Sequence, residues 1–208
     1  MEEAVNGSPF DEQAVDTDPI AQFRRWFDDA QHAGALQPDV MIVATTTPTG
    51  DPSARAVLLR GFDERGFCFY TSYASRKGRE LEANPRAAVV FHWPEVARQV
   101  RVTGHVERVS TVESEAYWVA RPRESRISAW ASEQSEPIAS RDELDRRASE
   151  VAARFGDGDV PLPPFWGGYR VVPEEMEFWQ HRDDRLHDRF AYSRRDPGLR
   201  WTVARLQP

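Results

Sequence analysis

The sequence predicts an α+β, mainly β fold, in which helices pack against an antiparallel β-barrel. Short apolar runs of strand length recur along the chain, and Gly, Pro, Asn and Asp turn residues separate them. The short spacing between these runs favours antiparallel connections. No internal repeat or convincing linker interrupts the pattern, so residues 18–208 are expected to form a single domain.

Composition limits the function before any motif is considered. The chain has 208 residues, of which 40% are hydrophobic and 29% charged, as in a soluble globular protein with a buried core. Its net charge of −7 argues against nucleic acid as the main partner. With one cysteine, Cys68, an intramolecular disulfide is impossible and a Cys-based zinc or iron–sulfur site is implausible; no metal site is predicted.

The amino terminus and the hydropathy of the chain indicate no targeting segment and no membrane partner. The first residues are acidic and lack the basic-then-apolar pattern of a secretory signal. No apolar run approaches the ~20 residues needed to cross a bilayer. A cytoplasmic location is therefore expected by default.

The first half of the chain begins with an arm and a helix. Residues 1–17 are acidic and poor in large apolar side chains, and are expected to form a mobile arm. A helix follows, with Asp18 as its cap, Pro19 at its first position and Gly34 after its end. Strands are then predicted at 40–46, 54–62 and 67–71, with a hairpin turn at 63–66.

The second half adds more strands and two capped helices. A short helix follows Ser75, and strands follow at 87–93, buried on both faces, and at 98–109. Ser110 with Glu113, and Ser140 with Glu143, form capping boxes for helices that end near 120 and 155. Between these helices, residues 121–125 are expected to form a polar, basic turn. The last strands are predicted at 169–172, 176–180, 186–192 and 201–206.

Two cations at the start of the short helix point to an anion site. Arg76 and Lys77 lie in its first turn, where the helix dipole prefers negative charge. An anion at this helix terminus would remove the conflict, since it could use the free backbone N–H groups and both side chains. A ligand therefore explains these two residues better than a solvated surface does.

A second cationic group lies near the carboxyl end of the chain. If residues 185–189 are extended, Arg185, His187 and Arg189 share one face of a strand. Three such groups repel one another unless an anion lies between them, although a solvated edge strand would also account for the charge. Together with the first group, this pattern is typical of a site for a flat, phosphorylated ligand.

Several short motifs occur in the order found in one enzyme family. They are Arg-Ala-Val-Leu-Leu-Arg at 55–60, Phe-Tyr-Thr at 69–71, Ser-Arg-Lys-Gly at 75–78, Arg-Gln-Val at 98–100, Arg-Pro-Arg-Glu-Ser at 121–125, Gln-Ser at 134–135, Phe-Trp-Gln at 178–180 and Arg-Leu-His-Asp-Arg at 185–189. From residue 18 to 208 the chain resembles the pyridoxamine 5′-phosphate oxidase family. The resemblance implies a split β-barrel, FMN as cofactor, and a homodimer in which both chains complete each site.

The resemblance also implies a role for individual residues. Those implied to bind FMN are Arg55, Ala56, Val57, Leu58, Leu59, Arg60, Tyr70, Thr71, Arg76, Lys77, Gln99, Gln134, Ser135, Trp179 and Arg189. Those implied to bind the substrate are Arg60, Tyr117, Arg121, Ser125, Arg185 and His187. Arg185 and His187 would cover the pyridine ring, and they are the candidate catalytic residues.

The implied reaction is the oxidation of pyridoxamine or pyridoxine 5′-phosphate. A hydride passes from the substrate to FMN, O2 reoxidises the flavin to give H2O2, and pyridoxal 5′-phosphate is released. The flavin carries the chemistry, while the protein supplies alignment and electrostatics.

The chain departs from the family pattern where substrate would bind. The family usually has Lys at Arg60, Gln at Arg126, and Gly at Ser128 and His181. The family arm carries an Arg and a Tyr, whereas residues 2–10 here contain neither. Two alternatives therefore stand beside the leading interpretation: a flavin oxidase of specialised metabolism, such as one acting late in phenazine assembly on a substrate without phosphate, and a flavin or pyridoxal-phosphate carrier without turnover.

Overall fold

The computed structural model describes residues 10–194, 196 and 198–208, and within them the strands form one sheet. The strands are β1 Val40–Thr46, β2 Pro52–Leu58, β3 Gly61–Asp63, β4 Gly66–Ser72, β5 Arg86–Trp93, β6 Arg98–Arg108, β7 Trp166–Gln180, β8 Asp188–Ser193 and β9 Thr202–Arg205. The helices are α1 Pro19–His32, α2 Arg76–Ala83, α3 Thr111–Ala120, α4 Arg123–Ala131 and α5 Arg141–Phe155, with a 3-10 turn at Pro94–Val96.

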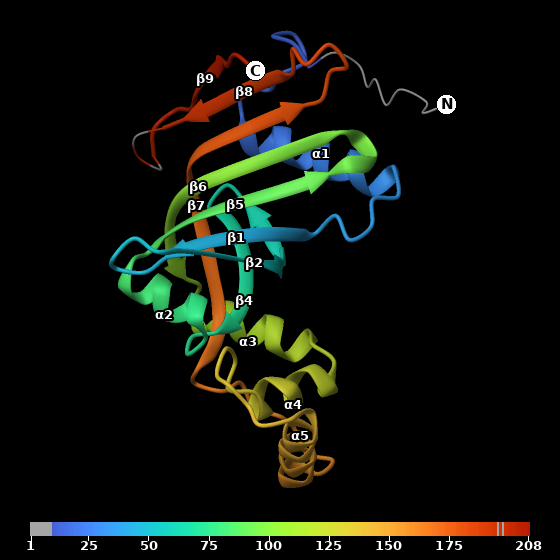
Figure 1. Ribbon diagram of the computed structural model, residues 1–208, viewed down its shortest axis with the longest axis vertical. Helices are drawn as coiled ribbons and strands as arrows, with labels where there is room; N and C mark the ends of the chain where they lie inside the picture. Colours follow the sequence, from blue (N-terminus) through green and yellow to red (C-terminus); the bar gives the residue numbers. More distant parts are fainter. Residues whose placement is uncertain (1–9, 195, 197) are drawn as a thin grey trace.

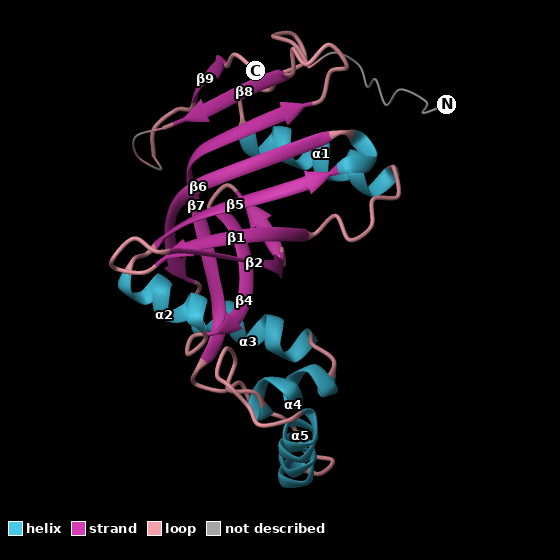
Figure 2. Ribbon diagram, in the orientation of Figure 1, coloured by secondary structure: helices cyan, strands magenta, loops and turns pink. Residues whose placement is uncertain are grey.

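Every strand pairing in the described chain is antiparallel. The order is β2-β1-β5-β6-β7-β4-β3, and β8 pairs with β7 and β9 with β8. The sheet curls into a half-barrel with α1 on one side and α3, α4 and α5 gathered at one end (Figure 1, Figure 2). This arrangement confirms the predicted mainly β fold class with flanking helices.

Helix α1 covers the sheet with an aromatic face. The Asp18 carboxylate accepts a hydrogen bond from the backbone N–H of Ile20 at 2.9 Å, so the predicted cap is confirmed. Phe23 is fully buried, and its ring centroid lies 4.8 Å from those of Phe67 and Phe91. Burial of each such ring contributes on the order of 1.5–3 kcal/mol, so this contact between helix and sheet is the centre of the core.

One strand predicted from the sequence is divided into two strands in the structure. The sequence predicts a strand over 54–62, but β2 ends at Leu58 and β3 starts at Gly61. Leu59 donates its backbone N–H to Asp39, beside β1, whereas Arg60 donates to Cys68 of β4. Because β2 and β3 are the two ends of the strand order, this change of partner brings the two edges of the curled sheet together.

The opposite error occurs in β7, where two predicted strands are one. The strand runs unbroken through Pro173, which lies opposite Gly104 of β6 at a register shift. Thr103 pairs with Glu175 and Gly104 with Pro173, so Glu174 is the extra residue of a bulge in β7. Proline has no backbone N–H to give to a ladder, and a bulge beside it accommodates that loss. A Cβ on Gly104 would lie 1.9 Å from the carbonyl oxygen of Val172, so the close approach requires glycine there.

The helical end also differs from prediction. The prediction of a turn at 121–125 is wrong for residues 123–125, which form the first turn of α4 after Pro122 as its cap. The capping box at Ser110 and Glu113 is complete. At α5 only the Ser140 half forms, because the Glu143 carboxylate pairs instead with Arg146 and Arg147.

Two further expectations concern burial. Strand β5 alternates between buried and more exposed residues instead of being buried on both faces, and His92 is exposed. Of the expected arm, residues 1–9 lie outside the described residues. Within the described part, Phe10 is 3% exposed and packs against Trp26 and Phe190, with ring centroids 4.8 and 5.0 Å away.

Candidate active site

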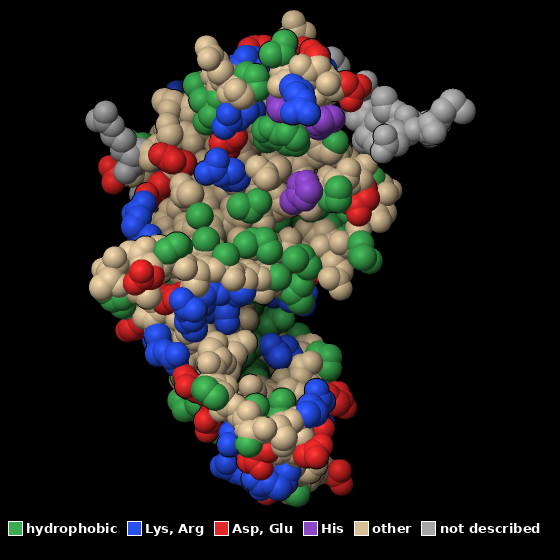
Figure 3. All heavy atoms as spheres, viewed as in Figure 1, with side chains coloured by type: hydrophobic (Ala, Val, Ile, Leu, Met, Phe, Trp, Pro, Cys, Tyr) green, Lys and Arg blue, Asp and Glu red, His purple; other side chains and the backbone are tan. Residues whose placement is uncertain are grey.

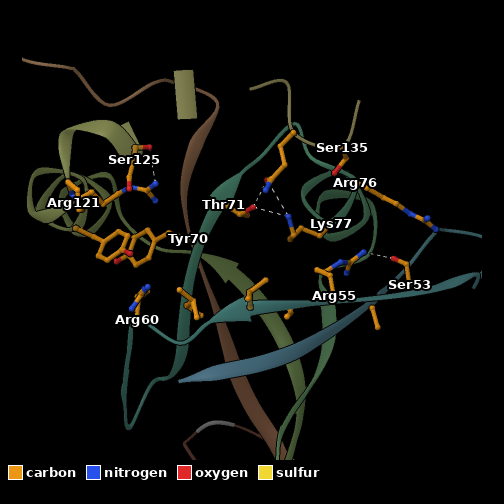
Figure 4. A pocket seen from close by; sticks show the side chains of 17 residues that line it. Ser53, Arg55, Arg60, Tyr70, Thr71, Arg76, Lys77, Arg121, Ser125 and Ser135 are labelled. Atoms are coloured by element: carbon orange, nitrogen blue, oxygen red, sulfur yellow. Dashed lines mark hydrogen bonds between the residues drawn. The ribbon is translucent and has the colours of Figure 1, made fainter. Parts of the chain in front are cut away.

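A cavity of about 860 Å3 opens between the edge of the sheet and the helices. Figure 3 shows Lys and Arg side chains around this hollow, and Figure 4 shows the side chains that line it. The lining includes most of the predicted site residues: Arg55, Ala56, Val57, Leu58, Arg60, Tyr70, Thr71, Arg76, Lys77, Tyr117, Arg121, Ser125, Gln134 and Ser135. The labelled cations lie at two separate ends of the cavity (Figure 4).

Lys77 lies at one end, buried with 6% exposure. Its Nζ donates to Thr71 Oγ1 at 3.0 Å and to Ser75 Oγ and Gln134 Oε1 at 3.3 Å. Burial, and after it the charge of nearby Arg55, lower the pKa of Lys77 to about 8, while Glu80 opposes the change. The ammonium group is therefore held by neutral oxygens at the start of α2, where an anion would be stabilised.

A buried carboxylate holds the arginines of the same end. Glu80, one turn along α2, accepts hydrogen bonds from Ser53 Oγ at 2.6 Å, Arg76 Nε at 2.8 Å and Arg55 Nη2 at 3.3 Å. Thr45 Oγ1 also donates to it. Burial alone raises the pKa of Glu80, but the hydrogen bonds outweigh that effect and hold the pKa at about 2, so the group is ionised.

The other end combines aromatic rings with Arg121. The rings of Tyr70 and Tyr117 stack with centroids 4.0 Å apart, and the Arg121 guanidinium lies 4.6 Å from the Trp166 ring centroid. Arg121 Nη2 donates to the Ser125 carbonyl at 3.0 Å, while its buried Nε has no partner among the described residues. Burial raises the pKa of Tyr70 to about 12, so its phenol stays neutral.

The remaining predicted residues do not line this cavity, and all of them except Leu59 form a second group on β6, β7, β8 and the loop before β8: Gln99, Trp179, Arg185, His187 and Arg189. Gln99 pairs with Trp179, and Trp179 pairs with Arg189, so these three lie side by side across β6, β7 and β8. The ring of His187 lies 4.7 Å from that of Trp179. Leu59 joins neither group, because its side chain is buried in the core.

The loop before β8 corrects the predicted geometry of the second group. Arg185 lies in a turn with φ of 62°, and the strand starts only at Asp188, so Arg185, His187 and Arg189 do not follow one extended strand. His187 Nδ1 accepts the backbone N–H of Arg182 at 3.1 Å. Neutral His187 therefore carries its proton on Nε2. Burial lowers the pKa of His187, and the neighbouring His181 lowers it further.

Sequence reasoning missed three residues of the site. Ser53 and Glu80 hold the cations, and Trp166 supports Arg121. Ser53 occupies the same face of β2 as Arg55, which is the signal that could have found it. Glu80 and Trp166 come close to the site only through tertiary structure, and no local pattern marks them.

The described residues contain no group of three or more His, Cys, Asp or Glu side chains that could hold a metal ion. Among the same residues, no helix is long and apolar enough to cross a membrane.

Comparison with known proteins identifies the family. Residues 27–155 match the family described as pyridoxamine 5′-phosphate oxidase, and residues 166–208 match the pyridoxine 5′-phosphate oxidase C-terminal dimerisation region. The pyridoxine/pyridoxamine 5′-phosphate oxidase of Rubrobacter xylanophilus is 59% identical over 95% of this chain and 90% of its own. The enzyme of that name from Cupriavidus taiwanensis is 54% identical over 95% and 92%.

A solved structure agrees with this assignment. PhzG from Burkholderia lata 383, in complex with tetrahydrophenazine-1-carboxylic acid, superposes with a TM-score of 0.92 at 33% identity, over 99% of this chain and all of that one. The sequence relatives, the shared fold and the two matched regions lead to the same conclusion. The chain belongs to the pyridoxamine 5′-phosphate oxidase family.

Proposed function

We propose that this protein is an FMN-dependent oxidase that converts pyridoxamine or pyridoxine 5′-phosphate to pyridoxal 5′-phosphate, with O2 reduced to H2O2. The observation that carries the proposal is the single cavity with a cationic group at each end and stacked aromatic rings beside one of them. Two anions that share one cavity need two separated sets of donors. The names of the 59% and 54% identical relatives support the same activity.

The end at α2 fits the phosphate of FMN. Lys77, Arg55 and Arg76 supply positive charge, and the free N–H groups at the start of α2 add donors. Ala56, Val57 and Leu58 of β2 would line the rest of the cofactor, with Tyr70, Thr71, Gln134 and Ser135 on the other sides. When bound, FMN supplies the hydride acceptor and the subsequent reaction with O2.

The end at α4 fits the substrate phosphate. Arg121 and Arg60 supply charge, and Tyr117 and Ser125 supply hydroxyl groups. The Arg121 Nε is buried without a partner among the described residues, which suits a group that acquires ligand contacts. The stacked rings of Tyr70 and Tyr117 form one wall of this end.

The second group of residues would serve the partner chain of a homodimer. Gln99, Trp179, Arg185, His187 and Arg189 do not line the cavity of their own chain. Most of them lie in the region matched to a dimerisation region, which supports a contribution across a two-fold interface. Within this proposal, Arg185 and His187 cover the substrate ring, and His187 donates a hydrogen bond from Nε2.

The experiment is an oxidase assay on purified protein under air. We expect yellow protein that releases FMN on heating, identified by chromatography, and H2O2 formation with pyridoxamine 5′-phosphate. Release of FAD, or no flavin binding after reconstitution, would contradict the cofactor. FMN without peroxide formation would instead favour a carrier without turnover.

A second candidate is a flavin oxidase of specialised metabolism that acts on a substrate without phosphate. The fold similarity to PhzG, at 33% identity, and the departures at Arg60 and Ser128 favour it. The cationic donors at the Arg121 end favour the phosphorylated substrate. Steady-state kinetics with pyridoxamine 5′-phosphate and with unphosphorylated pyridoxamine separate the two, since the second candidate predicts no preference for the phosphate.

A further inference from the structure

Glu80 lies where a negative charge has no obvious place, beside three cations in a proposed phosphate site. Its side chain is 5% exposed and accepts hydrogen bonds from three elements. Thr45 donates from β1, Ser53 and Arg55 donate from β2, and Arg76 donates from the first turn of α2 itself. A buried carboxylate with this many donors is a fixed structural point and not a solvated surface charge.

The contacts show what Glu80 does to the arginines. The Nη2 group of Arg55 donates hydrogen bonds to Ser53 and Glu80. Its Nη1 group donates to Thr45 and to the Val43 carbonyl, so the guanidinium is fixed on both sides. Arg76 gives Nε to Glu80, which fixes an otherwise half-exposed side chain at the helix start. Both cations are thus ordered by the protein alone.

The charges show a second effect. Arg55, Arg76 and Lys77 carry three positive charges, and Glu80 offsets one of them. The remaining charge of about +2 is opposite in sign and close in magnitude to that of a phosphate monoester, about −1.5 to −2 at neutral pH. The charged groups next to Lys77 are Arg55 on β2 and Glu80 and Arg76 on its own helix; its other contacts, Thr71, Ser75 and Gln134, are neutral.

We propose that Glu80 is a positioning residue for the flavin phosphate: it holds Arg55 and Arg76 in place before the cofactor binds. The inference rests on the proposed function, because it takes FMN as the ligand of this end. It predicts that a negatively charged residue strengthens the binding of a negatively charged ligand.

The test is the titration of apo-protein with FMN, followed by quenching of flavin fluorescence. At pH 6, well below the pKa of about 8 of Lys77 in the wild type, Glu80→Gln should bind FMN roughly tenfold more weakly. Arg76 and Arg55 donate to different oxygens of Glu80, and glutamine keeps only one of these acceptors. If Glu80 only repelled the phosphate, the same variant would bind FMN more tightly. Equal or tighter binding therefore overturns the proposal.

The dependence on pH separates charge from shape. FMN affinity should fall as pH rises through the titration of Lys77 in the apo-protein, and the fall should start at a lower pH in Glu80→Gln. Glu80→Asp keeps the charge, so its profile should begin to fall where that of the wild type does. A Glu80→Gln profile that coincides with the wild type contradicts the effect on Lys77.

Two controls make the result specific. Riboflavin lacks the phosphate, so Glu80→Gln should change riboflavin affinity little. Glu113→Gln removes another carboxylate paired with an arginine, Arg170, that does not line the cavity; it should lower stability and leave FMN affinity unchanged. If wild-type apo-protein does not bind FMN, the proposed function fails; if it binds FMN and Glu80→Gln binds equally well, only this inference fails.

Discussion

At the scale of residues, Arg121 is the side chain whose surroundings most clearly indicate a bound anion, because it is a partly buried cation without a carboxylate beside it. Burial lowers its pKa, the neighbouring Arg60 lowers it further, and the guanidinium is supported by Trp166 instead of a carboxylate. Among the described residues no ion pair to Arg121 is found, whereas most of the other arginines in this part of the chain have one. A phosphate would supply the missing negative charge.

We expect Arg121→Ala to lower the specificity constant for pyridoxamine 5′-phosphate by roughly 10- to 100-fold, since a charge-assisted contact worth ~1.4–2.8 kcal/mol is lost. FMN content should stay unchanged, because the flavin phosphate is assigned to the other end. Steady-state kinetics with phosphorylated and unphosphorylated substrate are the measurement.

The matched control is Arg126→Ala. Arg126 also has a buried Nε without a partner among the described residues, but it pairs with Asp159 and does not line the cavity. The Arg126→Ala protein should be less stable than the wild type but should keep its preference for the phosphorylated substrate. A loss of that preference in both variants, or in neither, would show that the phosphate pocket is assigned wrongly.

Individual residues also show which parts of the site could be predicted from the sequence. Arg76 and Lys77 could be predicted because cations at the start of a helix conflict with its dipole, which is a local signal. Glu80 could not, because a glutamate in a short polar helix is typical of a solvated surface until Thr45 and Ser53 are brought against it. His187 was predicted as a site residue, but its tautomer depends on the turn at Arg182.

At the scale of elements, the capping box of α3 also joins the helix to the sheet. Glu113 accepts from Ser110 at the cap and from Arg170 of β7, at 2.7 Å in the latter case. These contacts, the one from Arg170 first, lower the pKa of Glu113 from 4.5 to about 2. One carboxylate thus fixes where α3 leaves the sheet on its way to the cavity.

The stability that Glu113 contributes should depend on pH. Because its pKa is lower in the folded than in the unfolded state, the contribution is complete above about pH 4.5 and disappears as pH falls toward 2. Denaturant unfolding of Glu113→Gln at several pH values should show a loss relative to wild type at pH 7 that shrinks below pH 4. A difference that stays constant with pH would refute the linkage.

The bulge between β6 and β7 leads to another prediction. Gly104→Ala would push a methyl group into the Val172 carbonyl, so we expect destabilisation of about 1–3 kcal/mol. Gly61→Ala is the control, because no atom lies within 4 Å of its added Cβ. Thermal unfolding of both variants is the measurement, and equal melting temperatures would contradict the packing argument.

Elements were predicted well where their signals are local. Caps and hydrophobic spacing fixed α1, α2 and α3, and turn residues separated most strands. The breaks at Leu59 and the continuity through Pro173 were not predictable, since each depends on a partner strand far away in the sequence. Strand β5 looks buried on both faces in sequence, but in the single chain one of its faces is partly exposed.

At the scale of the whole molecule, the residues expected at one site lie in two groups of one chain. Motifs in a sequence show that residues belong to one site, but they do not show whether one chain supplies all of them. The cavity collects residues of β2, β4, α2, α3 and α4, while β6, β7, β8 and the loop before β8 carry the second group. In the two-fold dimer proposed above, each group would complete the partner's site, which would account for this separation. Sedimentation should therefore give twice the chain mass of 23.8 kDa.

Complementation between inactive variants tests this arrangement directly. Lys77→Ala damages the cavity, and Arg185→Ala damages the second group, so each homodimer should have two defective sites. A heterodimer of the two, purified with two different tags, would have one site with both defects and one site with none. We expect it to show about half of the wild-type activity per dimer.

A heterodimer of Lys77→Ala with Arg121→Ala is the control. It should recover no activity, since both changes lie in the cavity and every site keeps one of them. If the first heterodimer is no more active than its parents, each chain supplies its own complete site and the shared-site proposal is wrong.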